Sequence, residues 1–587
     1  MSKICRKEGL ELRKNLPGYL LMAPAVIAIL ALSVYPLFRG IYLSFLNYNL
    51  VRPNDPAFNT FAGLQNYIDI FKDKVFIQSI GNTVKWTVIN LVVQLVAAML
   101  LALALNQKLK GRSVYRTLIL VPWAVPHAIA AMTFTFLYNA NVGIINILAV
   151  KLGMITESVS WLGNVGSAFW CVVLVAIWKG IPFQMIFILA ALQGISGDVY
   201  ESAEIDGASR WQCFWKITLP IIKEPLAIST ILNLIGIVSC FNTIWLMTKG
   251  GPLYSTEIIY TYAYRRAFID HNFGTAAAAS VVLFIFMAVF SGVYLKMVSE
   301  KEEGGGNYMH TKQRNEAIRH VVAYIFTIVM VFLAVTPFIY VVLTALKTKE
   351  QIYDLSQIIP THITFDNFRQ VLFQSNFVRY FMNSIFITLV TTLICMILSV
   401  MAAYGLTRYR IVGAGKIKMA VLMTRMFPGI LLCIPYYIIM KQLNLIDSYI
   451  GLILMYCSFT LPFAIWNTCA FFISIPWELE EAARIDGCSR LKSFFHVIIH
   501  VAKPGLFVTA LFCFMTSWDE YMYASIFINT TLKKTIQVGM QDFVGQYSVD
   551  WGLLMSAVVI SLIPILIFFA LVQKNLVQGL SAGAVKG

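Results

Sequence analysis

Residues 201–220 read ESAEIDGASRWQCFWKITLP, and residues 481–500 read EAARIDGCSRLKSFFHVIIH. The glutamates that open the two segments and the glycines at Gly207 and Gly487 keep the same spacing of 280 residues. Each segment is a polar island between long apolar runs. Each predicts a short acidic helix, a glycine turn and a second, amphipathic helix, because acidic residues suit the first turn of a helix and glycine allows the backbone to reverse. The chain therefore contains one structural unit twice.

The composition is typical of a membrane protein with many spans. Hydrophobic residues make up 59% of the 587 residues, charged residues 13%, and the mean hydropathy is +0.73. A soluble core does not need so much apolar surface. The formal net charge of +16 then indicates a positive-inside bias and not nucleic-acid binding. The ten cysteines are scattered and favour small buried apolar positions over a disulfide framework or a metal site.

Apolar runs of about 20 residues predict the spans. There are about twelve, in two sets of six, which makes an all-α membrane protein with two six-helix halves. The predicted spans of the first half are 18–46, 79–106, 117–138, 166–192, 226–247 and 275–297. Those of the second half are 320–346, 380–407, 418–440, 450–473, 506–528 and 552–573.

Basic residues predict the orientation. They cluster near the N-terminus, after the second span of each half, and between the halves, which places both termini and both repeated segments in the cytoplasm. Residues 299–318 contain Gly304-Gly305-Gly306 and are predicted to be a flexible cytoplasmic linker between a first half, 1–298, and a second half, 319–587. Both halves then begin on the same side, as expected for two joined subunits.

The repeated segment offers a docking surface. Aromatic and apolar side chains follow each glycine, and such groups suit a groove on a partner protein. An amphipathic loop lying at the membrane surface is the ordinary alternative. Two copies at equivalent places in two six-span halves favour docking.

The motif Glu-Ala-Ala, three residues, Gly, nine residues, Ile-x-Leu-Pro resembles the signature loop of ABC importer permeases. The first copy differs at Ser202, and the second ends in Val497, Ile499 and His500. Residues 178–183 (WKGIPF), 246–252 (LMTKGGP) and the alanines after Phe273-Gly274 resemble the first permease of maltose-type transporters, whereas 518–521 (WDEY) and the tail 575–587 resemble the second. The resemblance covers nearly the whole chain and implies a type I ABC importer permease fold, with two permeases fused.

The resemblance implies that each loop docks to an ATPase through a coupling helix. The matching positions are Glu201, Ala203, Asp206 and Gly207, and Glu481, Ala482, Ala483, Asp486 and Gly487. It also implies that the tail Gln578–Gly587 reaches into the ATPase dimer.

The resemblance also implies a substrate site on the spans before and after the first loop. The matching positions are Lys179, Gly180, Phe183, Asn233, Gly236, Ile237 and Cys240. At several of these positions the polar residue of the family is replaced in this chain. We therefore do not expect each position to contact the sugar as its counterpart does in the maltose transporter. Gly180 and Pro182 predict an interruption of their helix, as do Pro122 and Pro126 in the preceding span.

The chain itself carries no phosphate-binding loop. The nearest match, Gly413-Ala414-Gly415-Lys416, lacks the first glycine and is followed by Ile417. No catalytic residue, metal site or cofactor is therefore expected on this chain, and ATP and Mg²⁺ should bind to partner subunits. His496 and His500 are four residues apart, but without a third ligand they are better explained as surface residues of the loop.

The expected role is the permease of a sugar importer in a bacterial inner membrane. Its expected partners are two cytoplasmic ATPase subunits, an extracytoplasmic binding protein, lipid and an oligosaccharide or glycoside. The alternative is an ion-coupled secondary transporter, which requires carboxylates buried in the spans. No Asp or Glu lies near the centre of a predicted span, although Asp519 and Glu520 are close enough to the eleventh span to be checked. A membrane protein without transport activity is a third possibility.

Overall fold

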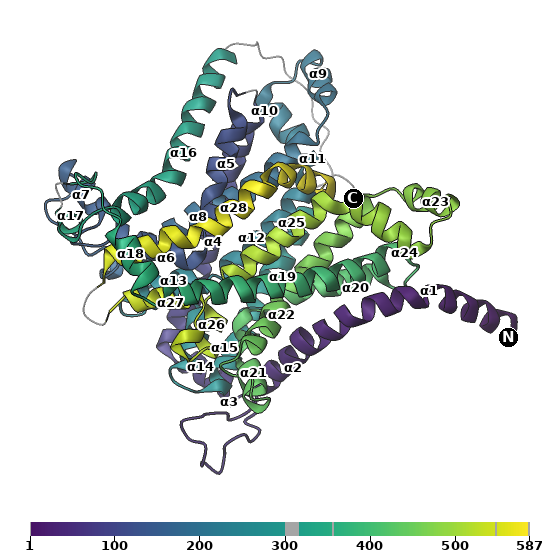
Figure 1. The fold of residues 1–587 in the computed structure, drawn as a ribbon, viewed down its shortest axis with the longest axis horizontal. Helices are drawn as coiled ribbons and strands as arrows, with labels where there is room; N and C mark the ends of the chain where they lie inside the picture. The colour runs from purple at the N-terminus through teal and green to yellow at the C-terminus, as the bar shows by residue number, and fades with distance from the viewer. Residues whose placement is uncertain (1, 108, 300–315, 355–356, 546–548, 585–587) are drawn as a thin grey trace.

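The computed structural model describes residues 2–107, 109–299, 316–354, 357–545 and 549–584. Within these ranges the chain is almost entirely helical, and the only β pairings are bridges between single residues. Ten helices are long and apolar enough to cross a membrane, and two further pairs of helices pass the same test together although each pair is bent. The prediction of an all-α protein with about twelve spans is confirmed (Figure 1).

The helices form two series with the same order. The first series is α1 (Ser2–Ile29), α2 (Tyr35–Leu43), α3 (Gln65–Lys72), α4 (Lys74–Asn106), α5 (Arg112–Ala124), α6 (His127–Leu137), α7 (Ile144–Lys151), α8 (Val165–Gln193), α9 (Gly197–Ile205), α10 (Arg210–Cys213), α11 (Leu219–Ile221), α12 (Lys223–Val238), α13 (Phe241–Thr248), α14 (Ile259–Phe268) and α15 (Phe273–Ser299).

The second series is α16 (Glu316–Ala345), α17 (Lys349–Tyr353), α18 (Asp366–Phe373), α19 (Phe377–Arg408), α20 (Ala414–Met423), α21 (Gly429–Gln442), α22 (Tyr449–Ser474), α23 (Glu478–Ile485), α24 (Arg490–Ser493), α25 (Ile499–Trp518), α26 (Met522–Phe527), α27 (Ile536–Gly539) and α28 (Trp551–Ala584). Most of the predicted linker, 300–315, lies outside the described residues, so its flexibility and the exact limits of the halves stay predictions.

The third predicted span of each half is not one straight helix. Between α5 and α6 the chain bends by 93° at Val125-Pro126, and between α20 and α21 it bends by 87° at Phe427-Pro428. Proline has no N–H and disfavours helical conformation in the residue before it, so the helix ends there. The prediction that Pro126 interrupts its span is confirmed, whereas the same prediction for Pro122 is wrong, because Pro122 lies inside α5. Span five is broken too, at Ser239-Cys240 in the first half and at Asp519 to Tyr521 in the second.

The predicted interruption at Gly180 and Pro182 is wrong. Helix α8 runs from Val165 to Gln193 without a break and contains Pro182 in its interior. Gly180 instead allows close packing, because a Cβ atom there would lie 2.3 Å from the Gln94 side chain of α4. Gly180 therefore allows two helices to pack closely and does not bend α8.

The two halves interlock through their first spans. Helix α1 packs against α19 of the second half, and α16 packs against α5 and α4 of the first (Figure 1). The α1–α19 contact is close because Gly18 and Gly405 face each other; a Cβ at Gly405 would lie 2.6 Å from the Gly18 carbonyl oxygen. Small residues at such crossings let two helix backbones approach.

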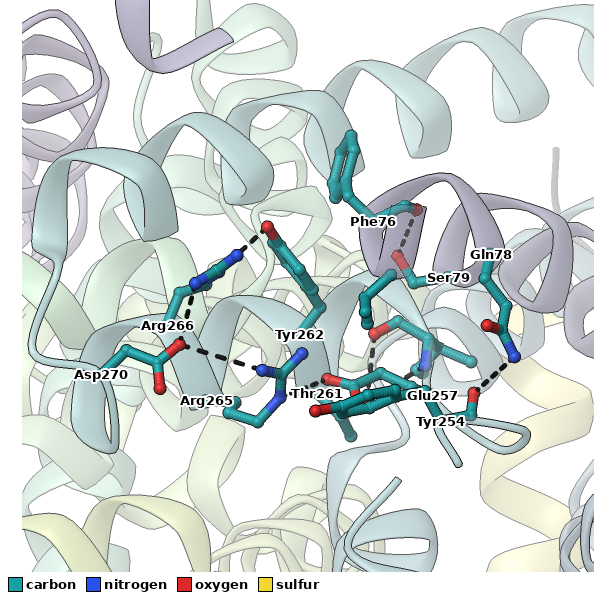
Figure 2. A network of polar contacts seen from close by, with 12 residues as sticks. Phe76, Gln78, Ser79, Tyr254, Glu257, Thr261, Tyr262, Arg265, Arg266 and Asp270 are labelled. Carbon is teal, nitrogen blue, oxygen red and sulfur yellow. Dashed lines mark hydrogen bonds and ion pairs between the residues drawn. The ribbon is translucent and has the colours of Figure 1, made fainter. Parts of the chain in front are cut away.

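A polar network fixes the segment between α13 and α15 to the start of α4 (Figure 2). Arg265 Nε bonds Glu257 Oε1 at 3.1 Å, and Arg266 Nη1 bonds Asp270 Oδ2 at 3.1 Å. From α4, Gln78 donates to the Tyr254 carbonyl at 3.1 Å. Burial raises the pKa of Glu257, an effect that the neighbouring Arg265 opposes. The network lies at the end of the bundle opposite α9 and α23.

Replacing Gly405 by leucine tests the interlock. The side chain would collide with the α1 backbone, and overpacking of this kind costs about 1–3 kcal/mol. We expect a lower midpoint of thermal unfolding for Gly405→Leu in detergent. The matched control is Gly292→Leu in α15, where no atom lies within 4 Å of an added Cβ; equal midpoints for the two variants would show that the crossing does not depend on this glycine.

Candidate functional site: the repeated loops and the broken spans

Both repeated loops have the predicted form of a helix, a glycine turn and a second helix. Helix α9 ends at Ile205 and α23 at Ile485. The glycines two residues later, Gly207 and Gly487, have φ angles of +78° and +86°. In the first loop the N–H of Ala208 bonds the Ala203 carbonyl at 2.9 Å, and the N–H of Gly207 bonds the Glu204 carbonyl at 3.1 Å. These two bonds define a Schellman motif, which requires a left-handed residue at the glycine position.

The second loop repeats this pattern bond for bond. The N–H of Cys488 bonds the Ala483 carbonyl at 3.0 Å, and the N–H of Gly487 bonds the Arg484 carbonyl at 3.2 Å. A serine then caps the next helix in each loop: Ser209 accepts from Gln212 N–H, and Ser489 accepts from Lys492 N–H. The 280-residue repeat is therefore a repeat of backbone geometry.

A π-helix follows each loop, and the sequence analysis missed it. It spans Phe214–Thr218 in the first half and Phe494–Ile498 in the second. A π-turn widens the helix by one residue and is frequent at functional sites. The spacing of the aromatic residues in these segments does not distinguish a π-helix from an α-helix.

The loops expose apolar side chains at equivalent places. Ile205 and Ile485 are each 85% exposed, and Trp211 and Leu491 are also exposed. Figure 1 shows α9 and α23 on the same side of the molecule, at the upper right. Exposed apolar groups beside polar ones are typical of protein interaction surfaces.

The predicted docking residues lie on this surface, with one exception. Glu201, Asp206, Glu481, Ala482, Asp486 and Gly487 are exposed, Gly207 and Ala483 are half-buried, and Ala203 is buried. Ala203 belongs to the closing hydrogen bond of the turn. What these residues bind stays a prediction, because no partner is present.

A second group of polar residues surrounds the break between α5 and α6. The Lys179 ammonium of α8 bonds the carbonyls of Val125 and, at 3.3 Å, Trp123, which are at the end of α5. Asp519 of the second half accepts the His127 N–H at 2.5 Å and also contacts the His127 ring, at the start of α6.

These contacts match the charges of the two helix ends. The C-terminal end of a helix carries a partial negative charge and the N-terminal end a partial positive one. The cation lies at the end of α5 and the carboxylate at the start of α6. The break is thus stabilised by one residue from each half, and Asp519 joins the halves.

Most of the predicted substrate residues are engaged in contacts between helices. Asn233 of α12 donates to Gln94 Oε1 at 2.9 Å, and Gln94 in turn donates to the Ala176 carbonyl of α8 at 3.0 Å. The Ile237 carbonyl accepts from the Trp86 indole at 2.8 Å. Gln94 thus ties α4, α8 and α12 together.

The other predicted positions differ in their surroundings. The ring of Phe183 stacks on that of Trp123, with centroids 5.9 Å apart, and Cys240 Sγ lies 3.4 Å from the Thr243 hydroxyl. Gly236 is exposed and has open space beside it. Their role in substrate binding stays a prediction. His127 was missed in the sequence because a single histidine beside a proline has no distinctive pattern.

The break in the second half has different partners. Tyr523 donates to the Gly429 carbonyl at 2.9 Å, and the Tyr260 hydroxyl of the first half lies beside Gly429. Arg425 stacks over the Phe463 ring, 5.0 Å from its centroid. Tyrosine hydroxyls therefore contact the first residue of α21, where the first break has charged residues.

Asp519→Asn tests the account of the first break. The variant keeps the shape but loses the charge at the start of α6, and such charge–helix interactions contribute up to about 2 kcal/mol when partly buried. We expect a lower thermal midpoint. In a double-mutant cycle with His127→Gln, the two losses should be less than additive.

Asp366 at the start of α18 is the control for this experiment. It is also an acidic residue in a first helical turn, but it is exposed. Asp366→Asn should change the midpoint little. Additive losses in the cycle, or an equal loss in Asp366→Asn, would contradict the account.

Comparison with known families identifies the repeat. The family described as "Binding-protein-dependent transport system inner membrane component" matches residues 94–299 and 396–582, which together are more than half of the chain. Each match contains one of the two repeated loops and the spans around it. The family domain is therefore present twice, and two permease halves are joined in one chain.

Curated relatives have the length of one half. The trehalose/maltose transport system permease protein MalF of Thermococcus litoralis is 34% identical over 288 residues, which are 49% of this chain and 95% of that protein. The trehalose transport system permease protein SugB of Mycobacterium tuberculosis is 36% identical, covering 43% of this chain and 93% of its own length. The sulfoquinovosyl glycerol transport system permease protein SmoG of Agrobacterium fabrum is 33% identical, covering 50% and 94%. The chain belongs to the family of binding-protein-dependent transport system inner membrane components.

Proposed function

We propose that this chain is the pair of permeases of an ATP-driven sugar importer. One observation carries the proposal: the same closed loop with an exposed apolar tip occurs once in each of the two family domains. Two equal docking surfaces on one side of the molecule suit two ATPase subunits, which would bind ATP and Mg²⁺ and supply the hydrolysis. This side is then cytoplasmic, together with both termini, in a bacterial inner membrane.

The substrate class is inferred from the relatives and from the spans. The three relatives are named for trehalose, maltose and sulfoquinovosyl glycerol, which are all glycosyl compounds. Aromatic rings such as Phe183, with amides nearby on the spans, suit a sugar, because its C–H face stacks while its hydroxyls form hydrogen bonds. An oligosaccharide or glycoside delivered by an extracytoplasmic binding protein fits both observations.

The mechanism follows from the geometry of the loops. Closure of two ATPase subunits on ATP would pull α9 and α23 together and move the halves to which these helices belong. The contact between Asp519 and His127 lies between the halves, away from the loops. A relative motion of the halves would change this contact and the access to the spans around it.

The loop glycines test the proposal. We would measure ATP hydrolysis in lipid nanodiscs, with the ATPase that co-purifies with the chain and a binding protein loaded with trehalose, maltose or sulfoquinovosyl glycerol. Valine at Gly207 or Gly487 must adopt a left-handed conformation that costs about 1–2 kcal/mol. We expect each variant to lose roughly tenfold in stimulated hydrolysis, since each 1.4 kcal/mol corresponds to a factor of ten.

Gly413→Val is the matched control. Gly413 also has a positive φ, +75°, and open space around it, but it lies outside both loops. Stimulation should survive in this variant. Absence of a co-purifying ATPase, together with uptake driven by an ion gradient, would overturn the proposal in favour of a secondary transporter.

A further inference from the structure

The second docking loop carries a buried carboxylate that has no counterpart in the first. On α23, Glu478 and Glu481 are exposed, as is Asp486 directly after the helix, whereas Glu480 is only 3% exposed. A carboxylate is rarely buried unless it is paired. Glu480 therefore faces the membrane spans and not the docking surface.

Three side chains surround the Glu480 carboxylate. The Tyr404 hydroxyl of α19 donates to Oε1 at 2.7 Å. Arg408 Nε lies 3.8 Å from Oε2, and Arg490 Nε lies 3.7 Å from Oε1. Arg408 is itself buried, with 4% exposure. The loop is thus attached to the end of α19 by one hydrogen bond and a buried ion pair.

The arginines extend this attachment to two other elements. Arg408 Nη2 donates to the carbonyls of Phe472 and Ile475 at the end of α22, at 3.1 and 2.9 Å. Arg490 Nη2, from α24, donates to the Arg408 carbonyl at 2.7 Å. The Arg490 guanidinium also stacks on the Tyr409 ring, 3.8 Å from its centroid. Helices α19, α22, α23 and α24 are held at one point.

The first loop has a different arrangement at the equivalent positions. Tyr200 occupies the place of Glu480, at the 280-residue spacing, and its hydroxyl contacts Thr218 Oγ1 at 3.0 Å, within its own loop. Helix α4 ends with Asn106 where α19 ends with Arg408. Glu480 and Arg408 are therefore replaced by neutral residues in the first half, whereas Arg490 keeps an arginine, Arg210, at the 280-residue spacing.

We propose that Glu480 is a positioning residue that locks the second docking loop to spans α19 and α22, so that ATPase closure is transmitted to these spans. This inference rests on the proposed function. A buried ion pair resists separation, because removing one partner leaves an uncompensated charge.

Glu480→Gln and Tyr200→Phe are the paired variants that test this inference. The first keeps the shape of the side chain and removes the charge; the second removes the hydroxyl contact at the same position of the other loop. In proteoliposomes we would measure basal ATP hydrolysis and the number of sugars imported per ATP. The sugar is whichever of trehalose, maltose and sulfoquinovosyl glycerol gives the highest stimulated rate.

We expect Glu480→Gln to retain its ATPase and its basal hydrolysis but to import roughly tenfold fewer sugars per ATP, within the usual range of coupling between sites. Tyr200→Phe should keep the wild-type ratio. A variant that merely misfolds would lose basal hydrolysis as well, so the ratio separates positioning from folding.

Charge removal on both sides supplies a second measurement. Glu480→Gln combined with Arg408→Gln leaves no unpaired buried charge, so the thermal midpoint should recover relative to Glu480→Gln alone. The import ratio should stay low, because the attachment is still absent. An unchanged ratio in Glu480→Gln, equal losses in Glu480→Gln and Tyr200→Phe, or full recovery of the ratio in the double variant would overturn the inference. Absence of ATP-dependent import in the wild type would refute the proposed function, and the inference with it.

Discussion

A helix that stops inside an apolar bundle leaves carbonyls on one side of the stop and N–H groups on the other without helical partners. This constraint acts at the bend between α5 and α6, where the chain turns by 93°. Lys179 supplies the donor to the carbonyls and Asp519 accepts from the N–H at the start of α6. Because Asp519 belongs to the second half, the first half cannot complete its own broken span. The fusion of two permeases in one chain thus joins two halves that already depend on each other.

The other end of the molecule has the opposite requirement. The repeated loops expose apolar tips and yet have a defined shape, because the Schellman turns at Gly207 and Gly487 close the helices with their own backbone. The backbone shape is therefore equal in the two loops, whereas the side chains at the position of Glu480 differ. Glu480 reaches Tyr404 and two arginines, and its counterpart Tyr200 reaches only Thr218 among the contacts described for that side chain. The pseudo-symmetry is one of backbone geometry and not of electrostatics.

The sequence predicted what depends on local pattern. Apolar runs gave the spans, the 280-residue repeat gave the loops, and Pro126 gave the bend in its span. It did not predict contacts between residues far apart in the chain, such as His127 with Asp519 or Glu480 with Arg408, because neither partner carries a local signal. Gly180 was interpreted wrongly for the same reason: a glycine followed by a proline suggests an interruption, and only the position of Gln94 shows that the glycine serves close packing. The residues expected to bind substrate were found mostly within such contacts, whereas Gly236 is exposed and has open space beside it.

Transport in proteoliposomes tests the central claim most directly. Uptake of radiolabelled trehalose, maltose or sulfoquinovosyl glycerol would be followed with the binding protein outside and the ATPase inside, with ATP or ADP as the enclosed nucleotide and with the proton and sodium gradients collapsed by ionophores. The account predicts uptake that requires ATP and the binding protein and is unaffected by loss of the gradients. Uptake that proceeds with ADP and disappears when an ion gradient is collapsed would contradict it.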